Sequence, residues 1–194
     1  MRVLVTGFAP FGGHTENPST AIAKALDGLT HGAVTFVALA PVPVRYAEAA
    51  RAVLDEARAT GADAIVAFGL AASTSHVRVE RRAHNHARSA EPDAAGRVCA
   101  DQEAEPGGML ALTTPFDTEA VVAALRDAGL ACAPSDDAGG YVCNDLYYRL
   151  LAAARRGEGP AHVLFVHVPS DADRLAPLPD ALARALASAL RRDP

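Results

Sequence analysis

Several features that mark common protein classes are scarce or missing in this chain of 194 residues. Lys and Arg together number 18 against 23 Asp and Glu, so the formal net charge is −5. Proteins that bind nucleic acid neutralise phosphates with a basic surface, and we therefore expect no nucleic-acid partner. The apolar run 33–44, interrupted by two prolines, is much shorter than the roughly 20 residues of a membrane-spanning helix. We therefore expect no membrane association.

Cysteine is also rare, and the spacing of the cysteines argues against domains stabilised by disulfides or by zinc. Cys99, Cys132 and Cys143 form an odd set without a C-x-x-C pair, which favours neither a disulfide framework nor a zinc site. The seven histidines contain no H-x-x-x-H pair, so no metal is expected. Glycines and prolines interrupt the first 13 residues where a signal peptide needs an unbroken apolar core. Free thiols and no leader predict a cytoplasmic protein.

Strand and helix patterns alternate along the chain, which predicts an α/β fold with a mostly parallel sheet and helices on both faces. Short β-branched runs predict strands, and apolar residues at helical spacing predict helices. Without an internal repeat or linker, we expect one domain, 1–194. The predicted strands are 2–8, 33–42, 63–70, 75–85, 130–135 and 161–169, and the predicted helices are 17–29, 46–61, 118–129, 141–156 and 177–192. Residues 87–108 contain two prolines and many small or acidic residues and are interpreted as a loop.

The stretch DDAGGYVCNDLYYRLL places a cysteine where a helix begins. Val142, Leu146 and Leu150 recur every four residues, so Cys143 lies in the first turn. The unpaired N–H groups and the helix dipole there favour an anion, which predicts a lowered thiol pKa and a nucleophile. Free cysteine is nevertheless among the most buried residue types, so a packing thiol is the alternative interpretation.

Two further side chains could assist a nucleophilic thiol. His167 lies near the carboxyl end of a predicted strand, where active sites of α/β folds gather, and could act as the base. Glu80, on the strand 75–85, could orient that imidazole. The alternatives are a core histidine and a surface ion pair between Glu80 and the neighbouring arginines.

The loop after the first strand, TGFAPFGGHTENPS, is unusual in its aromatic content. It lacks the glycine spacing of a dinucleotide site and the lysine of a P-loop. Phe8 and Phe11 flank a proline and could form the walls of a pocket for a small flat ligand. Packing of the loop against the core is the alternative.

Four blocks in this order resemble the pyroglutamyl peptidase I family of cysteine peptidases: VLVTGFAPFGGHTENPS, VERRAHN, DDAGGYVCNDLYYRLL and FVHVP. The resemblance implies an open, twisted α/β/α fold and hydrolysis of the amide bond after an N-terminal pyroglutamate, without a cofactor. It implies Glu80, Cys143 and His167 as the catalytic residues. It also implies a small peptide substrate with a blocked N-terminus, and a homodimer or homotetramer. The expected substrate-binding residues are Phe8, Phe11, Leu70 and Val142.

The chain departs from the family pattern at two positions. Leu70 replaces the glutamine that many bacterial members carry, and Ala90 replaces an arginine, with Arg88 two residues away. These departures leave two alternatives open: an amidase for another cyclic or acylated N-terminus, and a protein that binds a small lactam without turnover.

Overall fold

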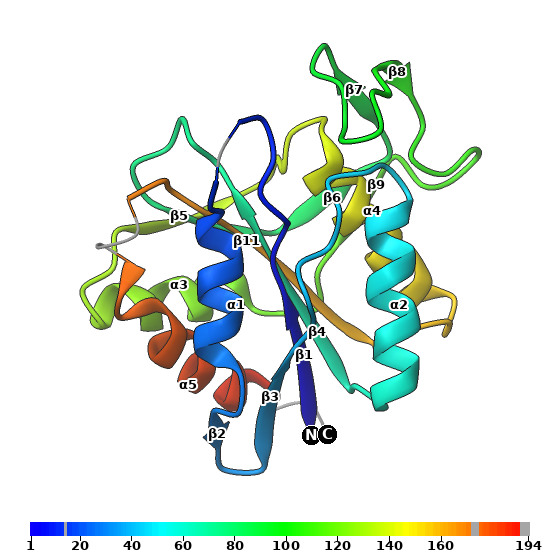
Figure 1. Ribbon diagram of the computed structural model, residues 1–194. Helices are drawn as coiled ribbons and strands as arrows, with labels where there is room; N and C mark the ends of the chain where they lie inside the picture. Colours follow the sequence, from blue (N-terminus) through cyan, green and yellow to red (C-terminus); the bar gives the residue numbers. More distant parts are fainter. Residues whose placement is uncertain (14, 172–174, 191–194) are drawn as a thin grey trace.

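The computed structural model describes residues 1–13, 15–171 and 175–190 of the chain. Within these residues, a seven-stranded sheet in the order β10-β5-β11-β4-β1-β3-β2 lies between two helical layers (Figure 1). The strands of this sheet are β1 (Arg2–Thr6), β2 (Thr30–His31), β3 (Val34–Ala38), β4 (Ala64–Leu70), β5 (Val77–Glu80), β10 (Cys132–Ser135) and β11 (His162–Val168). The helices are α1 (Pro18–Leu26), α2 (Glu48–Thr60), α3 (Thr118–Asp127), α4 (Val142–Arg155) and α5 (Leu178–Leu190).

The sheet is parallel at its centre and antiparallel in two places, as the mixed α/β prediction requires. β1 pairs in parallel with β3 and β4, and β4 pairs in parallel with β11. β5 runs antiparallel to β11, and β2 antiparallel to β3. The central strands are almost fully buried on both faces, which is why their sequences are continuous apolar runs rather than alternating ones.

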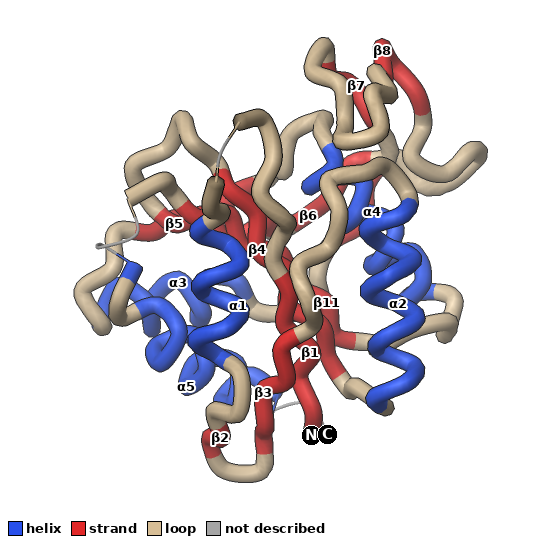
Figure 2. Tube along the Cα trace, in the orientation of Figure 1, coloured by secondary structure: helices blue, strands red, loops and turns tan. Residues whose placement is uncertain are grey.

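Two apolar cores separate the sheet from its helices. Helices α1, α3 and α5 cover one face of the sheet, and α2 and α4 cover the other (Figure 2). Their apolar side chains form one core on each face. Side chains alternate between the two faces along each strand, so Val166 of β11 joins the first core and Phe165 joins the second. The face covered by α4 is the one on which the predicted catalytic residues lie.

The predicted helix boundaries are confirmed where capping residues set them. The Asn17 side chain accepts a hydrogen bond from the Ser19 amide at the start of α1, and Pro18 is the first helical residue. α2 ends at Gly61, which adopts the left-handed conformation. Residue 14 of the predicted N-terminal loop and residues 191 and 192 of the predicted last helix lie outside the described residues. Among the described residues, no helix is long and apolar enough to cross a membrane.

The prediction that residues 87–108 form only a loop is wrong. β7 (Ala87–Ser89) and β8 (Cys99–Gln102) form a separate antiparallel pair, which projects beside the carboxyl end of the sheet (Figure 1). A second pair joins β6 (Arg82–His84) to β9 (Ala111–Thr113). The predicted strand 75–85 is therefore split at Arg81, since β5 belongs to the main sheet and β6 to this pair. β7, β8 and β9 are only three or four residues long and carry no apolar alternation, so the sequence pattern gives no sign of them.

Candidate active site

Two of the predicted catalytic residues, Glu80 and His167, come from adjacent antiparallel strands. In the register of β5 and β11, Glu80 lies opposite Phe165 and Arg78 lies opposite His167. Residues that face each other in an antiparallel pair share a face of the sheet. Phe165 packs in the core beneath α4, so the side chains of the other three residues also lie on the α4 face.

A short hydrogen bond joins His167 to Glu80. The imidazole Nδ1 lies 2.7 Å from Glu80 Oε1, and both side chains are buried, with 4% and 0% exposure. A carboxylate only accepts, so Nδ1 carries the proton and donates it. The other ring nitrogen, Nε2, is then the one with a lone pair that can accept a proton. The interpretation of Glu80 as a surface ion-pair residue is therefore excluded.

Cys143 is the second residue of α4, as predicted, and is partly exposed. Its Sγ lies directly above Gly69 of β4, where a Cβ added to the glycine would approach within 2.9 Å of the sulfur. Gly69 is the register partner of His167, so the thiol sits over the strand that adjoins the imidazole. The amides of Val142 and Cys143 are the first of the helix and have no acceptor within it.

The predicted lowering of the Cys143 pKa is wrong. Although the residue as a whole is partly exposed, its sulfur packs against β4, and this burial raises the pKa of the thiol to about 12; the negative charge of Glu80 adds to the effect. The positive charge of Arg78 and the backbone N–H of Cys143 act in the opposite direction but are smaller. Cys143 is therefore a thiol at neutral pH, and a base must remove its proton when it reacts.

A pocket of about 340 Å³ opens onto Cys143. It contains every residue predicted to bind substrate: Phe8, Phe11, Leu70 and Val142. Phe8 is almost fully buried and forms the floor with Val142, whereas Phe11 and Leu70 are partly exposed. The aromatic loop therefore has both of the proposed roles, because it packs on the core and also lines the pocket.

The remaining wall of the pocket comes from the segment predicted to be a loop and from the residue before α4. Glu91 and Tyr141 line it, and the Tyr141 hydroxyl donates to the Pro92 carbonyl at 2.8 Å. The Arg88 amide donates to the Gly140 carbonyl at 2.7 Å, which fixes this segment against the residues before α4. We call residues 87–102 the hairpin wall.

Two positions of the hairpin wall were expected to bear on the site through the family resemblance. Neither Arg88 nor Ala90 lines the pocket, and both are exposed. Glu91 does line it, together with Glu16 from the N-terminal loop. Both carboxylates were missed, because the fold of the hairpin wall and of the N-terminal loop brings them together and no local pattern marks them.

Arg78 is a further residue of the site, expected from the sequence only as one of the neighbouring arginines in a surface ion pair with Glu80; the pair is present, but the carboxylate is buried. Its Nε and Nη2 donate to Glu80 Oε1 at 3.1 and 3.0 Å, and Nη2 also donates to the Asp137 carbonyl at 3.0 Å. The spacing of Arg78 and Glu80, two residues apart on one strand, is the signal that could have found it.

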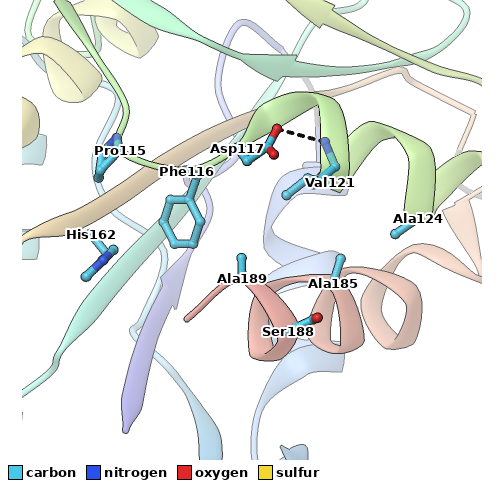
Figure 3. Close-up of a pocket in the computed structure, with 10 residues that line it drawn as sticks. Pro115, Phe116, Asp117, Val121, Ala124, His162, Ala185, Ser188 and Ala189 are labelled. Atoms are coloured by element: carbon cyan, nitrogen blue, oxygen red, sulfur yellow. Dashed lines mark hydrogen bonds between the residues drawn. The ribbon is translucent and has the colours of Figure 1, made fainter. Parts of the chain in front are cut away.

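A separate hollow lies at the opposite end of β11, between α3 and α5 (Figure 3). His162, the other histidine of this strand, lines it and packs edge-on against Phe116. Asp117 caps the nearby helix α3 by accepting from the Ala120 amide. None of the residues predicted for the active site lies in this hollow, so the choice of His167 over His162 agrees with the placement of the pocket.

A thiol beside a carboxylate-bound imidazole, at the carboxyl edge of an α/β/α sheet, is an arrangement suited to nucleophilic hydrolysis, and the protein is a cysteine peptidase. A model of one family, described as pyroglutamyl peptidase, matches residues 1–182. The chain belongs to the pyroglutamyl peptidase family.

Individual relatives agree in sequence and in fold. The chain is 33% identical over 168 residues to the pyrrolidone-carboxylate peptidase of Yersinia pestis, a match that covers 87% of this chain and 78% of the relative. The crystal structure of Bacillus amyloliquefaciens pyroglutamyl peptidase I superposes with a TM-score of 0.90 at 28% identity, over 98% of this chain and 97% of that one. The pyrrolidone carboxyl peptidase of Thermococcus litoralis gives 0.89 at 28% identity, over 98% and 93%.

Proposed function

We propose that this protein is a cysteine exopeptidase that hydrolyses the amide bond after an N-terminal pyroglutamate of small peptides. The observation that carries the proposal is the position of the Cys143 thiol, at the edge of a pocket with apolar and aromatic walls. A five-membered lactam is small, flat and mostly apolar, so Phe11 and Leu70 suit its faces. The names of the relatives point to the same substrate.

In the first step, His167 Nε2 accepts the proton of the Cys143 thiol while Sγ attacks the carbonyl carbon that joins pyroglutamate to the next residue. Glu80 holds the imidazole through Nδ1 and stabilises the positive charge that develops on it. Because burial raises the pKa of the thiol to about 12, Cys143 needs this base to lose its proton.

The tetrahedral intermediate carries a negative oxygen, which the free amides at the start of α4 can stabilise. The Val142 and Cys143 N–H groups are the donors we assign, because they belong to the first two residues of α4; the Gly139 N–H is occupied, since it donates to the Asp137 carboxylate at 2.8 Å. His167 then gives its proton to the departing amine as the carbon–nitrogen bond breaks. Water, deprotonated by His167, attacks the thioester, and free pyroglutamate and the Cys143 thiol are released.

Hydrolysis of a fluorogenic pyroglutamyl amide, compared with the matching prolyl and glutaminyl amides, tests this function. We expect turnover of the pyroglutamyl amide alone, and loss of that turnover in Cys143→Ala. Cys143→Ala provides the matched background, because any activity that it retains does not come from the thiol. Absence of pyroglutamyl turnover in the folded native protein would contradict the proposal.

One observation favours a second candidate function within the same chemistry. Leu70 lines the pocket with an apolar surface where many bacterial members carry glutamine, so one polar contact to a lactam is lost. The Asn17 side chain cannot replace it readily, because its oxygen already accepts from Ser19. If the substrate is a lactam, the carboxylate of Glu91 or Glu16 would accept the hydrogen bond from its N–H group instead. An amidase for another cyclic or acylated N-terminus would instead prefer a different member of a substrate panel.

We further propose that the enzyme acts in the cytoplasm as one domain and assembles as a homodimer or homotetramer. Three free thiols suit a reducing compartment. Light scattering of the purified protein measures the assembly. A monomer at all concentrations would contradict that part of the proposal.

A further inference from the structure

Arg78 contacts both members of the buried Glu80–His167 pair. Its side chain is 25% exposed, and its Nη2 lies 3.0 Å from Glu80 Oε1 and 3.4 Å from His167 Nδ1. Three donor contacts therefore converge on Glu80 Oε1, two from the guanidinium and one from the imidazole. The other carboxylate oxygen, Oε2, is buried and has no hydrogen-bond partner among the described residues.

The charge balance of this cluster depends on Arg78. A fully buried carboxylate is costly unless an opposite charge compensates it. A neutral imidazole supplies a hydrogen bond but no charge, so without Arg78 the carboxylate of Glu80 would be compensated by protonation of His167. With the guanidinium present, Glu80 stays ionised and His167 can rest neutral, with its proton on Nδ1.

The other groups around His167 do not supply this charge. Cys143 faces the site from α4 as a neutral thiol, and β4 contributes Gly69, which has no side chain. The Tyr147 hydroxyl of α4 donates to the backbone carbonyl of Glu80. Asp137, in the segment before α4, offers Arg78 its carbonyl, while its carboxylate accepts from the Gly139 amide.

We propose that Arg78 is a positioning residue that keeps Glu80 ionised and His167 neutral, so that Nε2 is available as a base at neutral pH. Arg78 acts through Glu80 and His167 and does not touch the reacting atoms. The inference rests on the proposed peptidase function, because it assigns a role to His167 as a base.

The test compares the pH dependence of kcat/KM in native protein, Arg78→Gln and Arg78→Lys. Loss of the cation favours the protonated imidazole, which is inactive as a base. The acid limb of the Arg78→Gln profile should therefore move to higher pH by about one unit, with roughly tenfold lower activity below it. Arg78→Lys keeps the charge, so its acid limb should stay close to the native one. Arg82→Gln is the matched control, because Arg82 pairs with Asp136 on the surface, and it should leave the profile unchanged.

Two additions keep the test decisive. Arg78→Gln removes the guanidinium beside a buried carboxylate and can unfold the protein, so the same substitution is also made in Glu80→Gln, where both charges are gone. The acid limb of the double variant should lie about one unit above that of Glu80→Gln alone. The pH dependence of Cys143 alkylation by iodoacetamide should show the same displacement of its acid limb. Alkylation requires no substrate, so it tests the role of Arg78 even if the proposed peptidase function is wrong. Coincident acid limbs with and without Arg78 in folded variants would overturn the proposal.

Discussion

Replacement of Gly69 by alanine tests the placement of the nucleophile directly. A Cβ at this position would lie 2.9 Å from Cys143 Sγ and 2.9 Å from Phe165 Cζ. Ordinary contacts begin near 3.4 Å, so the thiol and the ring must each retreat by about half an ångström. The backbone of Gly69 lies outside the left-handed region, and alanine therefore adds a steric change without backbone strain.

The expected effects on stability and on catalysis differ in size. Adding one methyl group to a packed site costs about 1–3 kcal/mol of unfolding free energy. A displacement of about 1 Å at a reacting group can lower a rate by roughly a hundredfold, so a shift of about half that size should lower kcat by about tenfold or more. KM should change much less, because the walls of the pocket remain in place.

Steady-state kinetics on a pyroglutamyl amide and urea unfolding measure the two effects separately. Gly159→Ala is a suitable control: its Cβ would crowd the flexible end of Leu54, at 2.9 Å, and meet Ala153 Cβ at an ordinary 3.7 Å, and Gly159 does not line the pocket at Cys143. This variant should lose a similar amount of stability or less and keep its kcat. If Gly69→Ala keeps the native kcat, the proposal that Cys143 reacts from its position above Gly69 is refuted.

Three other results follow from the same site. Substoichiometric iodoacetamide should modify Cys143 before Cys99 and Cys132, because Cys143 is partly exposed and the other two are buried. Its rate should rise first as His167 becomes available as a base and again toward the thiol pKa of about 12, and preferential labelling of another cysteine, seen by mass spectrometry of the digest, would contradict this. Phe11→Ala should raise KM severalfold with little change in the alkylation rate, and an unchanged KM would remove Phe11 from the substrate pocket. Glu80→Gln should lower kcat by much less than Cys143→Ala, whereas equal losses in folded variants would argue against a purely orienting carboxylate.

The central elements could be predicted because their sequence patterns are local. The apolar run of β11 and the four-residue spacing of α4 predict a strand and a helix without reference to the rest of the chain. Since carboxyl ends of parallel strands share one edge, His167 could be placed near the loops that follow β1 and β4. Phe8 and Leu70 belong to that edge.

The remaining parts of the site depend on contacts between distant segments. Gly69 can be assigned to the site only when the fold places α4 above it. Glu91 can be assigned to the pocket only when the hairpin wall packs against Tyr141. The Cys143 pKa was predicted in the wrong direction because the start of a helix favours an anion, whereas the burial of this thiol and the charge of Glu80 have a larger effect. Cys99 belongs to the segment interpreted as a loop, yet it is a fully buried residue of β8 within the hairpin wall.

Because the hairpin wall is a separate structural unit, the shape of the pocket and the geometry of the catalytic residues can change independently, by evolution or by engineering. The thiol, the imidazole and the carboxylate are held by the sheet and α4, whereas Glu91 lies in the connection between β7 and β8, a pair of short strands outside the main sheet. The hairpin wall is joined to the pocket through a few contacts, such as the Arg88–Gly140 and Tyr141–Pro92 hydrogen bonds. Substitutions within it can therefore reshape the pocket and alter which blocked N-termini fit, while the residues that break the bond keep their geometry.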